Sequence, residues 1–257
     1  MTLTTDELSF MYRNRDVLKK ISISLPDSEM VSVLGPNGVG KTTLLKCLNR
    51  ILRPKKGVVM VEGVDLSHLS ASEVARKIGY VPQKAEAGRL TTFDAVLLGR
   101  RPHIGWDVTD KDLSVVDSIL HQLKMNHLRL TYIDEMSGGE LQKVFIARAI
   151  VQEPRVLLMD EPTSNLDLKN KVEILTIIRR IVNDHHITVL MSMHDLNLAL
   201  WFSDRFIFLR DGRVLTQGGS DVLTPELIHD VYGVPVSMGE ICGVRCVVPH
   251  IEKRLHD

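Results

Sequence analysis

The sequence predicts an α/β fold: a mixed sheet flanked by helices, with an antiparallel β part and an inserted helical subdomain. Two observations predict it. Short apolar runs alternate with longer amphipathic stretches, as strands and helices alternate in α/β proteins. The segment from about 86 to 149 has few β-branched runs and predicts helices. We therefore expect one main domain over 1–233, with the helical subdomain at about 86–149, and a short appendage over 234–257.

Three buried strands and a hairpin are expected around this sheet. The hairpin follows from Asp211-Gly212, a dipeptide that readily supplies the positive φ angles of a tight turn. Its flanking strands are expected at 205–209 and 213–216. The buried strands are expected at three apolar runs, 30–34, 156–159 and 187–193.

Two helices are expected next to these strands. One should run from about Lys41 to Ile51. The other, before the third buried strand, carries apolar residues close to helical spacing at Leu168, Val172, Leu175, Ile178 and Val182.

The composition is that of an ordinary globular protein. Of the 257 residues, 44% are hydrophobic and 25% charged, and 32 Lys plus Arg balance 32 Asp plus Glu. Such a chain can bury a sizeable core, and its neutral balance argues against a surface for nucleic acid. No apolar run approaches the roughly 18 residues of a membrane span, and the N-terminus lacks a secretory pattern. We expect a cytosolic chain with no nucleic-acid partner.

The cysteines fit the same location. Cys47, Cys242 and Cys246 form an odd, sparse set, which suits a reducing compartment. Cys242 and Cys246 could also be read as half of a metal site, although no second ligand pair has zinc-type spacing.

A glycine-rich stretch predicts a phosphate-binding loop. Gly35-Pro-Asn-Gly-Val-Gly-Lys41-Thr42 matches G-x-x-x-x-G-K-[ST] without a gap, between an expected strand and an expected helix. The glycines let backbone N–H groups converge on phosphate oxygens, and the helix N-terminus adds positive partial charge. Lys41 can reach the β- and γ-phosphates, and the Thr42 hydroxyl can ligate Mg²⁺. The motif predicts a P-loop NTPase core.

Two acids end the second apolar run. Asp160 and Glu161 follow Val156-Leu-Leu-Met directly, so the strand should deliver them to the sheet edge where α/β proteins bind ligands. Asp160 is expected in the magnesium shell, and Glu161 is expected to polarise a water that attacks the γ-phosphate. An acid pair after a strand can also be a helix cap, but a phosphate loop nearby favours the catalytic interpretation.

A third motif resembles a known family. Ser137-Gly138-Gly139-Glu140, followed by Gln142, is similar to the signature of ATP-binding-cassette proteins, and it lies between the phosphate loop and the acid pair. The resemblance covers about residues 8–233 and implies an ATPase that uses ATP and Mg²⁺. It implies nucleotide contacts at Asp160 and at Gly35, Pro36, Asn37, Gly38, Val39, Gly40, Lys41, Thr42 and Thr43.

The resemblance implies further roles near the phosphates. Tyr12 stands where the family has an aromatic that stacks on adenine; a core tyrosine is the other interpretation. Gln83 is expected to touch magnesium and the attacking water, and His194 to contact the γ-phosphate, so that both act with Glu161 in catalysis. The magnesium ligands would be Thr42, Gln83 and Asp160.

The resemblance also implies a homodimer. In this family ATP lies between the phosphate loop of one subunit and the signature of the other, so a two-fold dimer completes two sites. Nucleotide contacts of the second copy are therefore expected at Ser137, Gly138, Gly139 and Asp167.

Two short strings resemble a subgroup, the importer ATPases for iron–siderophore, haem and cobalamin. They are Thr92–His103 and His194–Ala199, and Val231–Val234 is also similar to that group. The resemblance implies multi-span permease subunits as partners, indirectly a substrate-binding protein, and a peripheral place on the cytoplasmic face of the membrane. An iron–siderophore complex is the first expectation, with cobalamin, haem or molybdate left open. An exporter ATPase and a DNA-repair or translation-type ATPase are the alternatives.

Part of the first string is expected to contact the permease. Arg100, Arg101 and His103 flank Pro102, which limits collapse of the local backbone into a helix. We expect these three residues to edge a groove for a cytoplasmic helix of the permease. A basic surface turn is the other interpretation.

Overall fold

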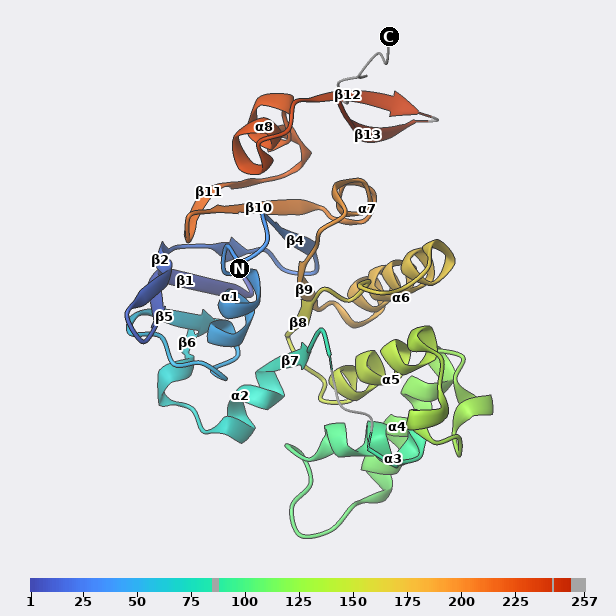
Figure 1. Cartoon of the computed structure of the whole chain (residues 1–257). Coiled ribbons are helices and arrows are strands. Elements are labelled where there is room, and N and C mark those ends of the chain that lie inside the picture. Colours follow the sequence, from blue (N-terminus) through green and yellow to red (C-terminus); the bar gives the residue numbers. More distant parts are fainter. Residues whose placement is uncertain (85–87, 242, 251–257) are drawn as a thin grey trace.

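The computed structural model describes residues 1–84, 88–241 and 243–250, which form a mixed, a smaller antiparallel and a two-stranded sheet with flanking helices (Figure 1). The strands are β1 Leu3–Tyr12, β2 Arg15–Ile21, β3 Ser24–Leu25, β4 Met30–Leu34, β5 Lys56–Val61, β6 Val64–Asp65, β7 Ile78–Val81, β8 Val156–Asp160, β9 Thr188–Ser192, β10 Arg205–Arg210, β11 Arg213–Gly218, β12 Val236–Ile241 and β13 Val244–Pro249. The α-helices are α1 Lys41–Leu48, α2 Ala71–Lys77, α3 Thr92–Leu97, α4 Asp110–Gln122, α5 Gly138–Ile150, α6 Leu168–His185, α7 Leu196–Phe202 and α8 Pro225–Tyr232.

The central sheet is mixed, as predicted. Its order is β11-β10-β4-β9-β8-β7, and every pairing is parallel except that of β11 with β10. The antiparallel part has the order β2-β1-β5-β6, with β3 beside β1. The three predicted buried strands correspond to β4, β8 and β9, and the predicted hairpin is β10–β11, with Asp211 and Gly212 at φ 51° and 75°.

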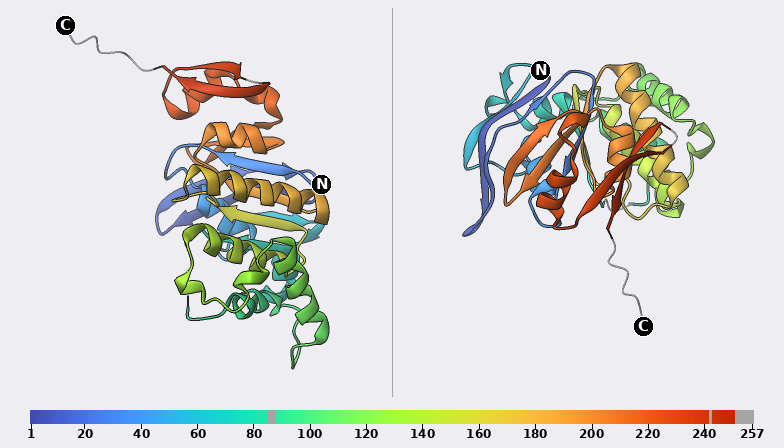
Figure 2. Two further views of the ribbon diagram at one scale, coloured as in Figure 1. Left: turned by 90° about the vertical axis from the view of Figure 1, so that its right-hand side faces the viewer. Right: turned by 90° about the horizontal axis from the view of Figure 1, so that it is seen from above.

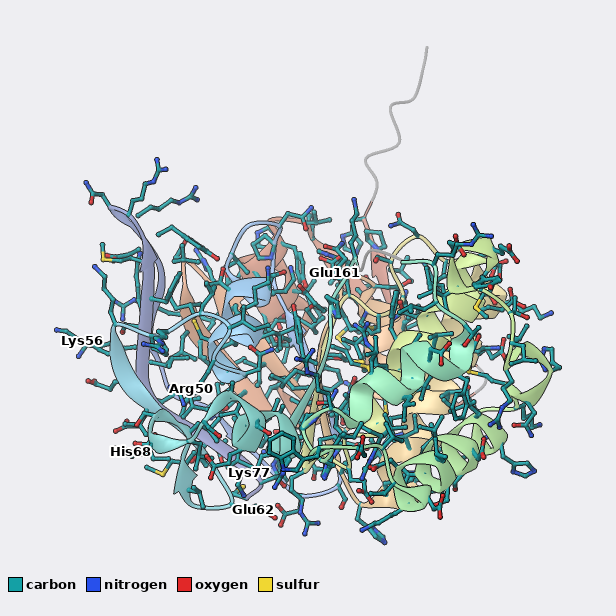
Figure 3. The ribbon with its side chains drawn as sticks, turned by 90° about the horizontal axis from the view of Figure 1, so that it is seen from below. Arg50, Lys56, Glu62, His68, Lys77 and Glu161 are labelled. Atoms are coloured by element: carbon teal, nitrogen blue, oxygen red, sulfur yellow. The ribbon has the colours of Figure 1, made fainter. Side chains whose placement is uncertain are left out.

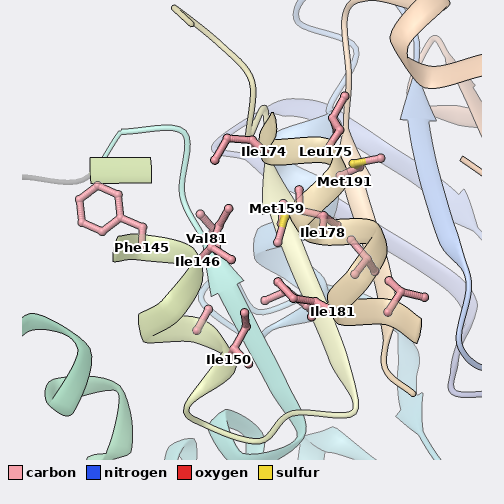
Figure 4. Packing of buried hydrophobic residues seen from close by; sticks show 14 of the residues in the cluster. Val81, Phe145, Ile146, Ile150, Met159, Ile174, Leu175, Ile178, Ile181 and Met191 are labelled. Atoms are coloured by element: carbon pink, nitrogen blue, oxygen red, sulfur yellow. The ribbon is translucent and has the colours of Figure 1, made fainter. Parts of the chain in front are cut away.

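Both faces of the central sheet are covered, which explains the unbroken apolar runs of its strands. Successive residues of β8 enter different cores. Leu157 and Met159 pack with α5 and α6 on one face, and Figure 4 shows Met159 among the side chains of these helices. Val156 and Leu158 pack with α1 and the antiparallel sheet on the other. The sheet can therefore hold the residues at its carboxyl edge rigidly.

Two helix predictions need adjustment. α1 ends at Leu48, three residues before the expected end, because the chain leaves the helix at Asn49. In α6, Leu175, Ile178 and Val182 are buried as expected, but Leu168 is 69% exposed and Val172 is 38% exposed. The helix instead presents Ile174 and Ile181 to the core, because its buried stripe begins later than the apolar spacing suggested.

The described residues between β7 and β8 form mainly helices, as expected, with α3, α4 and α5 arranged beside the sheet (Figures 1 and 2). The expected start of the subdomain, at about 86, lies outside the described residues. The independence of this segment as a subdomain within 1–233 stays a prediction. In the described part of the chain, no helix combines the length and the apolar character that a membrane crossing requires.

Among the described residues after Gly233, β12 and β13 pair as an antiparallel hairpin, which the sequence had left unassigned. The Asn197 amide of α7 accepts a hydrogen bond from the Val247 N–H at 2.8 Å and donates one to its carbonyl at 3.3 Å. The Trp201 Nε1–H donates to the Arg245 carbonyl at 3.0 Å. These bonds hold the hairpin against α7 (Figure 1).

The expectation that Arg100 edges a permease groove is wrong. Arg100 is 2% exposed. Its Nε–H donates to the Asp112 carboxylate at 3.0 Å, and its Nη1–H donates to Glu153 and to the Val151 carbonyl at 2.7 Å each. A buried guanidinium requires such partners. Arg100 therefore links α4, which contains Asp112, to the residues that follow α5. Arg101 is exposed, as expected, while His103 contacts the Gln152 carbonyl through Nε2 at 2.8 Å.

Candidate functional site

The predicted phosphate loop lies between β4 and α1. Gly35 has a φ of 147°, and a Cβ there would stand 2.4 Å from the Leu209 carbonyl oxygen, so a larger residue does not fit. The Lys41 ammonium turns back into the loop and donates to the carbonyls of Gly35 at 2.7 Å and Pro36 at 3.2 Å. Burial lowers the pKa of Lys41, and the nearby Glu161 and Asp160 oppose that shift. The Lys41 ammonium therefore stabilises the loop from within by binding two of its carbonyl groups.

Asp160 is buried at the carboxyl end of β8, where it meets the loop. Its Oδ1 accepts hydrogen bonds from the hydroxyls of Thr42 and Ser192, both at 2.9 Å. The structure thus brings the predicted pair Thr42 and Asp160 together. A hydroxyl and a carboxylate are hard oxygen donors of the kind that Mg²⁺ takes, usually together with waters and substrate phosphates.

Glu161 follows in a left-handed backbone conformation, with a φ of 50°. Non-glycine residues rarely adopt this region, and such strain concentrates at functional sites. The Glu161 N–H donates to the Ser192 hydroxyl at 2.8 Å, which helps to hold this conformation. Its carboxylate accepts a hydrogen bond from Gln83 Nε2 at 2.5 Å and contacts His194 Nε2. Gln83 and His194, the other two residues predicted for catalysis, therefore both contact Glu161.

A cavity of about 400 Å³ adjoins these groups. It is lined by Tyr12, Arg15, Val17, Asn37, Gly38, Gly40, Lys41, Thr42, Thr43, Glu161 and His194. Tyr12 is 48% exposed, and its ring meets that of Phe10 edge to face, with centroids 4.8 Å apart. A half-exposed ring at the rim of a cavity can stack on a flat ligand, which a core tyrosine cannot do.

The four nucleotide contacts predicted for the second copy, Ser137, Gly138, Gly139 and Asp167, lie at helix starts, and they do not line this cavity in the described single chain. Exposed Ser137 caps α5, and its hydroxyl and N–H donate to the Glu140 carboxylate at 2.6 and 3.0 Å. These bonds lower the pKa of Glu140. Exposed Asp167 caps α6 by accepting from the Asn170 N–H at 2.8 Å. Gly138 and Gly139 are the first residues of α5; Gly138 is exposed and Gly139 is buried.

The possible metal site of the cysteines has no support among the residues described, which contain no group of three or more His, Cys, Asp or Glu placed to hold a metal. Cys242 lies outside these residues, and Cys246 is a free thiol.

A sequence profile of the ABC transporter family matches residues 18–164, more than half of the chain. This chain belongs to the ABC transporter family. The ABC assignment agrees with the predicted signature and with the geometry around the phosphate loop. The chain is accordingly an ATP-binding subunit with ATPase activity coupled to transport.

Curated ABC relatives match along nearly the whole chain. An uncharacterized ABC transporter ATP-binding protein of Methanocaldococcus jannaschii is 49% identical over 249 residues, which are 97% of this chain and 98% of the relative. The ferric enterobactin transport ATP-binding protein of Escherichia coli is 32% identical over 255 residues, 96% and 93% of the two chains. Relatives named for cobalamin import in Halobacterium salinarum and for phosphonates import in Synechococcus are 35% and 34% identical, over 93% and 90% of this chain.

Solved ABC structures share the fold. One, described as an inward-facing conformation of a metal-chelate type ABC transporter, is 28% identical with a TM-score of 0.85 and covers 97% of each chain. Another, described as a dimeric post-hydrolysis state of an ATP-binding cassette bound to ADP and Pi, is 26% identical with a TM-score of 0.73. It covers 84% of this chain and 98% of the other.

Sequence reasoning missed four residues of this ABC site. Arg15 and Val17 line the cavity, and Ser192 and Tyr232 bond to other residues of the site. Ser192 pairs in register with Asp160 across β8 and β9 and bonds to both Asp160 and Glu161. A lone polar residue at the end of an apolar run was the available signal. Tyr232 accepts a hydrogen bond from the Gly35 N–H at 3.0 Å, and no local sequence pattern predicts this contact.

Proposed function

We propose that this chain is the ATPase subunit of a membrane importer, which powers uptake of a metal chelate, first of all an iron–siderophore complex. The observation that carries ATP hydrolysis is the convergence of Lys41, Thr42 and Glu161 on one cavity, with Asp160 bonded to the Thr42 hydroxyl. The metal-chelate assignment is supported by likeness to the ferric enterobactin protein and to the metal-chelate transporter structure. Cobalamin, haem, molybdate and phosphonate remain competing ligands.

In the proposed mechanism ATP lies along the phosphate loop, with adenine at Tyr12 and phosphates at the backbone N–H groups and Lys41. Thr42 and Asp160, with Gln83, would hold Mg²⁺, which neutralises phosphate charge when bound. Glu161 orients and deprotonates the attacking water. His194 fixes the Glu161 carboxylate and reaches the γ-phosphate, whose new charge the Lys41 ammonium stabilises.

A second copy completes the proposed site. Ser137 and the first backbone N–H groups of α5 would bind the γ-phosphate held by the partner's loop, because helix N-termini favour anions. The dimeric cassette among the structural relatives supports this arrangement. Closure over ATP and reopening after hydrolysis would supply the transport stroke.

The permease contact is proposed at a groove of about 520 Å³ between α1, α2 and β7. Its lining includes Arg50, Ile51, Val74, Tyr80 and Gln152. Figure 3 labels Arg50 well apart from Glu161. The groove lies just beyond the end of α1, which begins with Lys41, and Tyr80 is three residues before Gln83. A helix that binds in the groove can therefore act on Lys41 through α1 and on Gln83 through β7.

Replacing Ile51 should test this groove. Ile51 lines it and is 58% exposed, so an apolar anchor of the permease can pack there. In Ile51→Glu, we expect binding to the detergent-solubilised permease to fall about tenfold or more, with the basal ATPase of the isolated subunit kept within about twofold. Val64→Glu, an exposed apolar position on β6, is the control. Undiminished capture by Ile51→Glu would refute the groove assignment.

Replacing Tyr12 tests the adenine contact. Tyr12→Ala should raise the ATP concentration for half-maximal hydrolysis by roughly 5- to 150-fold, since base–aromatic stacking is worth about 1–3 kcal/mol. Tyr12→Phe keeps the ring and should change this ATP concentration little. An unaltered ATP titration in Tyr12→Ala would instead mean that the ring only packs on Phe10.

The transported ligand is tested in reconstituted vesicles. The chain should be co-purified with its permease from the native membrane, the permease identified, and the complex supplied with its binding protein. Uptake of a ferric siderophore, with cobalamin, haem, molybdate and phosphonate as parallel arms, measures the proposal. ATP-dependent uptake of another ligand alone would contradict the iron assignment, and outward transport would contradict import.

A further inference from the structure

The phosphate loop is tied to a distant part of the chain at its first residue. The Gly35 N–H donates to the Tyr232 hydroxyl at 3.0 Å, and Tyr232 is the last residue of α8. β4 ends at Leu34, so the Gly35 N–H bonds to this hydroxyl instead of to a neighbouring strand. We propose that Tyr232 is a positioning residue for ATP binding, whose hydroxyl holds the start of the phosphate loop in its nucleotide-binding shape.

Gly35 is held on both of its polar groups. Its carbonyl accepts the Lys41 ammonium at 2.7 Å, while its N–H binds Tyr232. Space around it is tight, because the Leu209 carbonyl oxygen lies 2.4 Å from where a Cβ would stand. Gly35 is buried, and a buried N–H without a partner is costly. Without the hydroxyl, the peptide group at Gly35 would turn toward water, and the loop would leave the shape that receives phosphates.

The hairpin β12–β13 keeps the tyrosine ring in place. Tyr232 packs against the cluster of Ile228, Val236 and Val247. Gly233, at a φ of 72°, ends α8 directly after it. Asn197 of α7 holds Val247 in place. Tyr232 also packs against the core cluster that includes Leu34 and Phe208 of the central sheet. The C-terminal hairpin therefore supports the nucleotide loop without touching the nucleotide.

The hydroxyl remains available over the whole working pH range. Burial raises the pKa of Tyr232 to about 12, although the Gly35 N–H opposes that shift. The phenol stays neutral at any pH at which an ATPase works, so the contact is not a pH switch. Its role is positional.

Tyr232→Phe in the full chain tests the role, since it keeps the ring and removes only the oxygen. A loop that is competent in only about a tenth of the molecules binds its ligand about tenfold more weakly. We expect the ATP concentration for half-maximal hydrolysis to rise about tenfold. The dissociation constant of a methylanthraniloyl-ADP probe should rise by the same factor. The rate at saturating ATP should stay within twofold, because Glu161 and its partners are untouched.

Amide hydrogen exchange gives a second measurement. The peptide that contains Gly35 should exchange faster in Tyr232→Phe than in the wild type, while Tyr132→Phe in the helical segment should change neither exchange nor nucleotide binding. The inference rests on ATP binding by the loop and not on the transported ligand, so a failed import test leaves it standing. Unchanged nucleotide affinity in Tyr232→Phe, with or without a lower melting temperature, would overturn it, and so would a loss confined to the saturated rate.

Discussion

Glu161→Gln is expected to reduce ATP hydrolysis by at least ~10²-fold, since a positioned general base contributes about 10² to 10⁴. Glutamine keeps the length of the side chain and removes its basicity. Its amide oxygen can still accept the hydrogen bond that Gln83 donates to Glu161 at 2.5 Å, so the site should keep its shape. ATP binding should remain, because the phosphate loop is untouched, and the proposed dimer should accumulate in its closed form.

Two measurements check this result. Phosphate release at saturating ATP gives the rate, and size-exclusion chromatography with ATP and Mg²⁺ gives the dimer. Glu7→Gln, an exposed position on β1, is the control and should behave as the wild type. A Glu161→Gln rate within a few-fold of the wild type would show that another group acts as the base.

Arg100→Ala is expected to lower the free energy of unfolding by about 3–5 kcal/mol, the usual result of removing one partner of a buried ion pair. The Asp112 side chain, 5% exposed, would keep its charge without the guanidinium. Its pKa is lowered to about 2, first by the Thr109 hydroxyl and further by Arg100. Arg100→Glu would bring three carboxylates together, the introduced one and those of Asp112 and Glu153, and should destabilise the helical segment. Its basal ATPase should therefore fall, whereas charge reversal at an exposed position should leave it unchanged.

Arg101→Ala is a matched control, because the neighbouring side chain is exposed and should change stability by no more than about 0.5 kcal/mol. Urea unfolding measures both variants. In a double-mutant cycle, Asp112→Asn should recover part of the loss in Arg100→Ala by removing the uncompensated charge. Equal stability of Arg100→Ala and Arg101→Ala would contradict the burial argument.

The sequence predicted those parts of the site that depend on local order. The phosphate loop needs a strand, glycines and a helix in succession, and all are adjacent between Met30 and Leu48. Asp160 and Glu161 were placed because a strand end fixes their position. The register between β8 and β9 decides the role of Ser192, and no pattern within either strand specifies that register.

Long-range packing escaped prediction for the same reason. Arg100 reads as a surface arginine until Asp112 and Glu153 are known to surround it. Tyr232 and Gly35 are far apart in the chain and meet only through the fold. Basic and aromatic side chains can be buried or exposed, and their partners decide which.

The capping of Ser137 has a consequence for the resting state. The hydroxyl and N–H that the proposed dimer would offer to a partner's γ-phosphate already bind the Glu140 carboxylate. An internal acid thus occupies the anion position at the start of α5, and the nucleotide must displace it. Closure of the proposed dimer would then replace one anion, the Glu140 carboxylate, by another, the γ-phosphate of the partner's nucleotide. In the proposed dimer, such an exchange would oppose association of subunits whose phosphate loops carry no triphosphate.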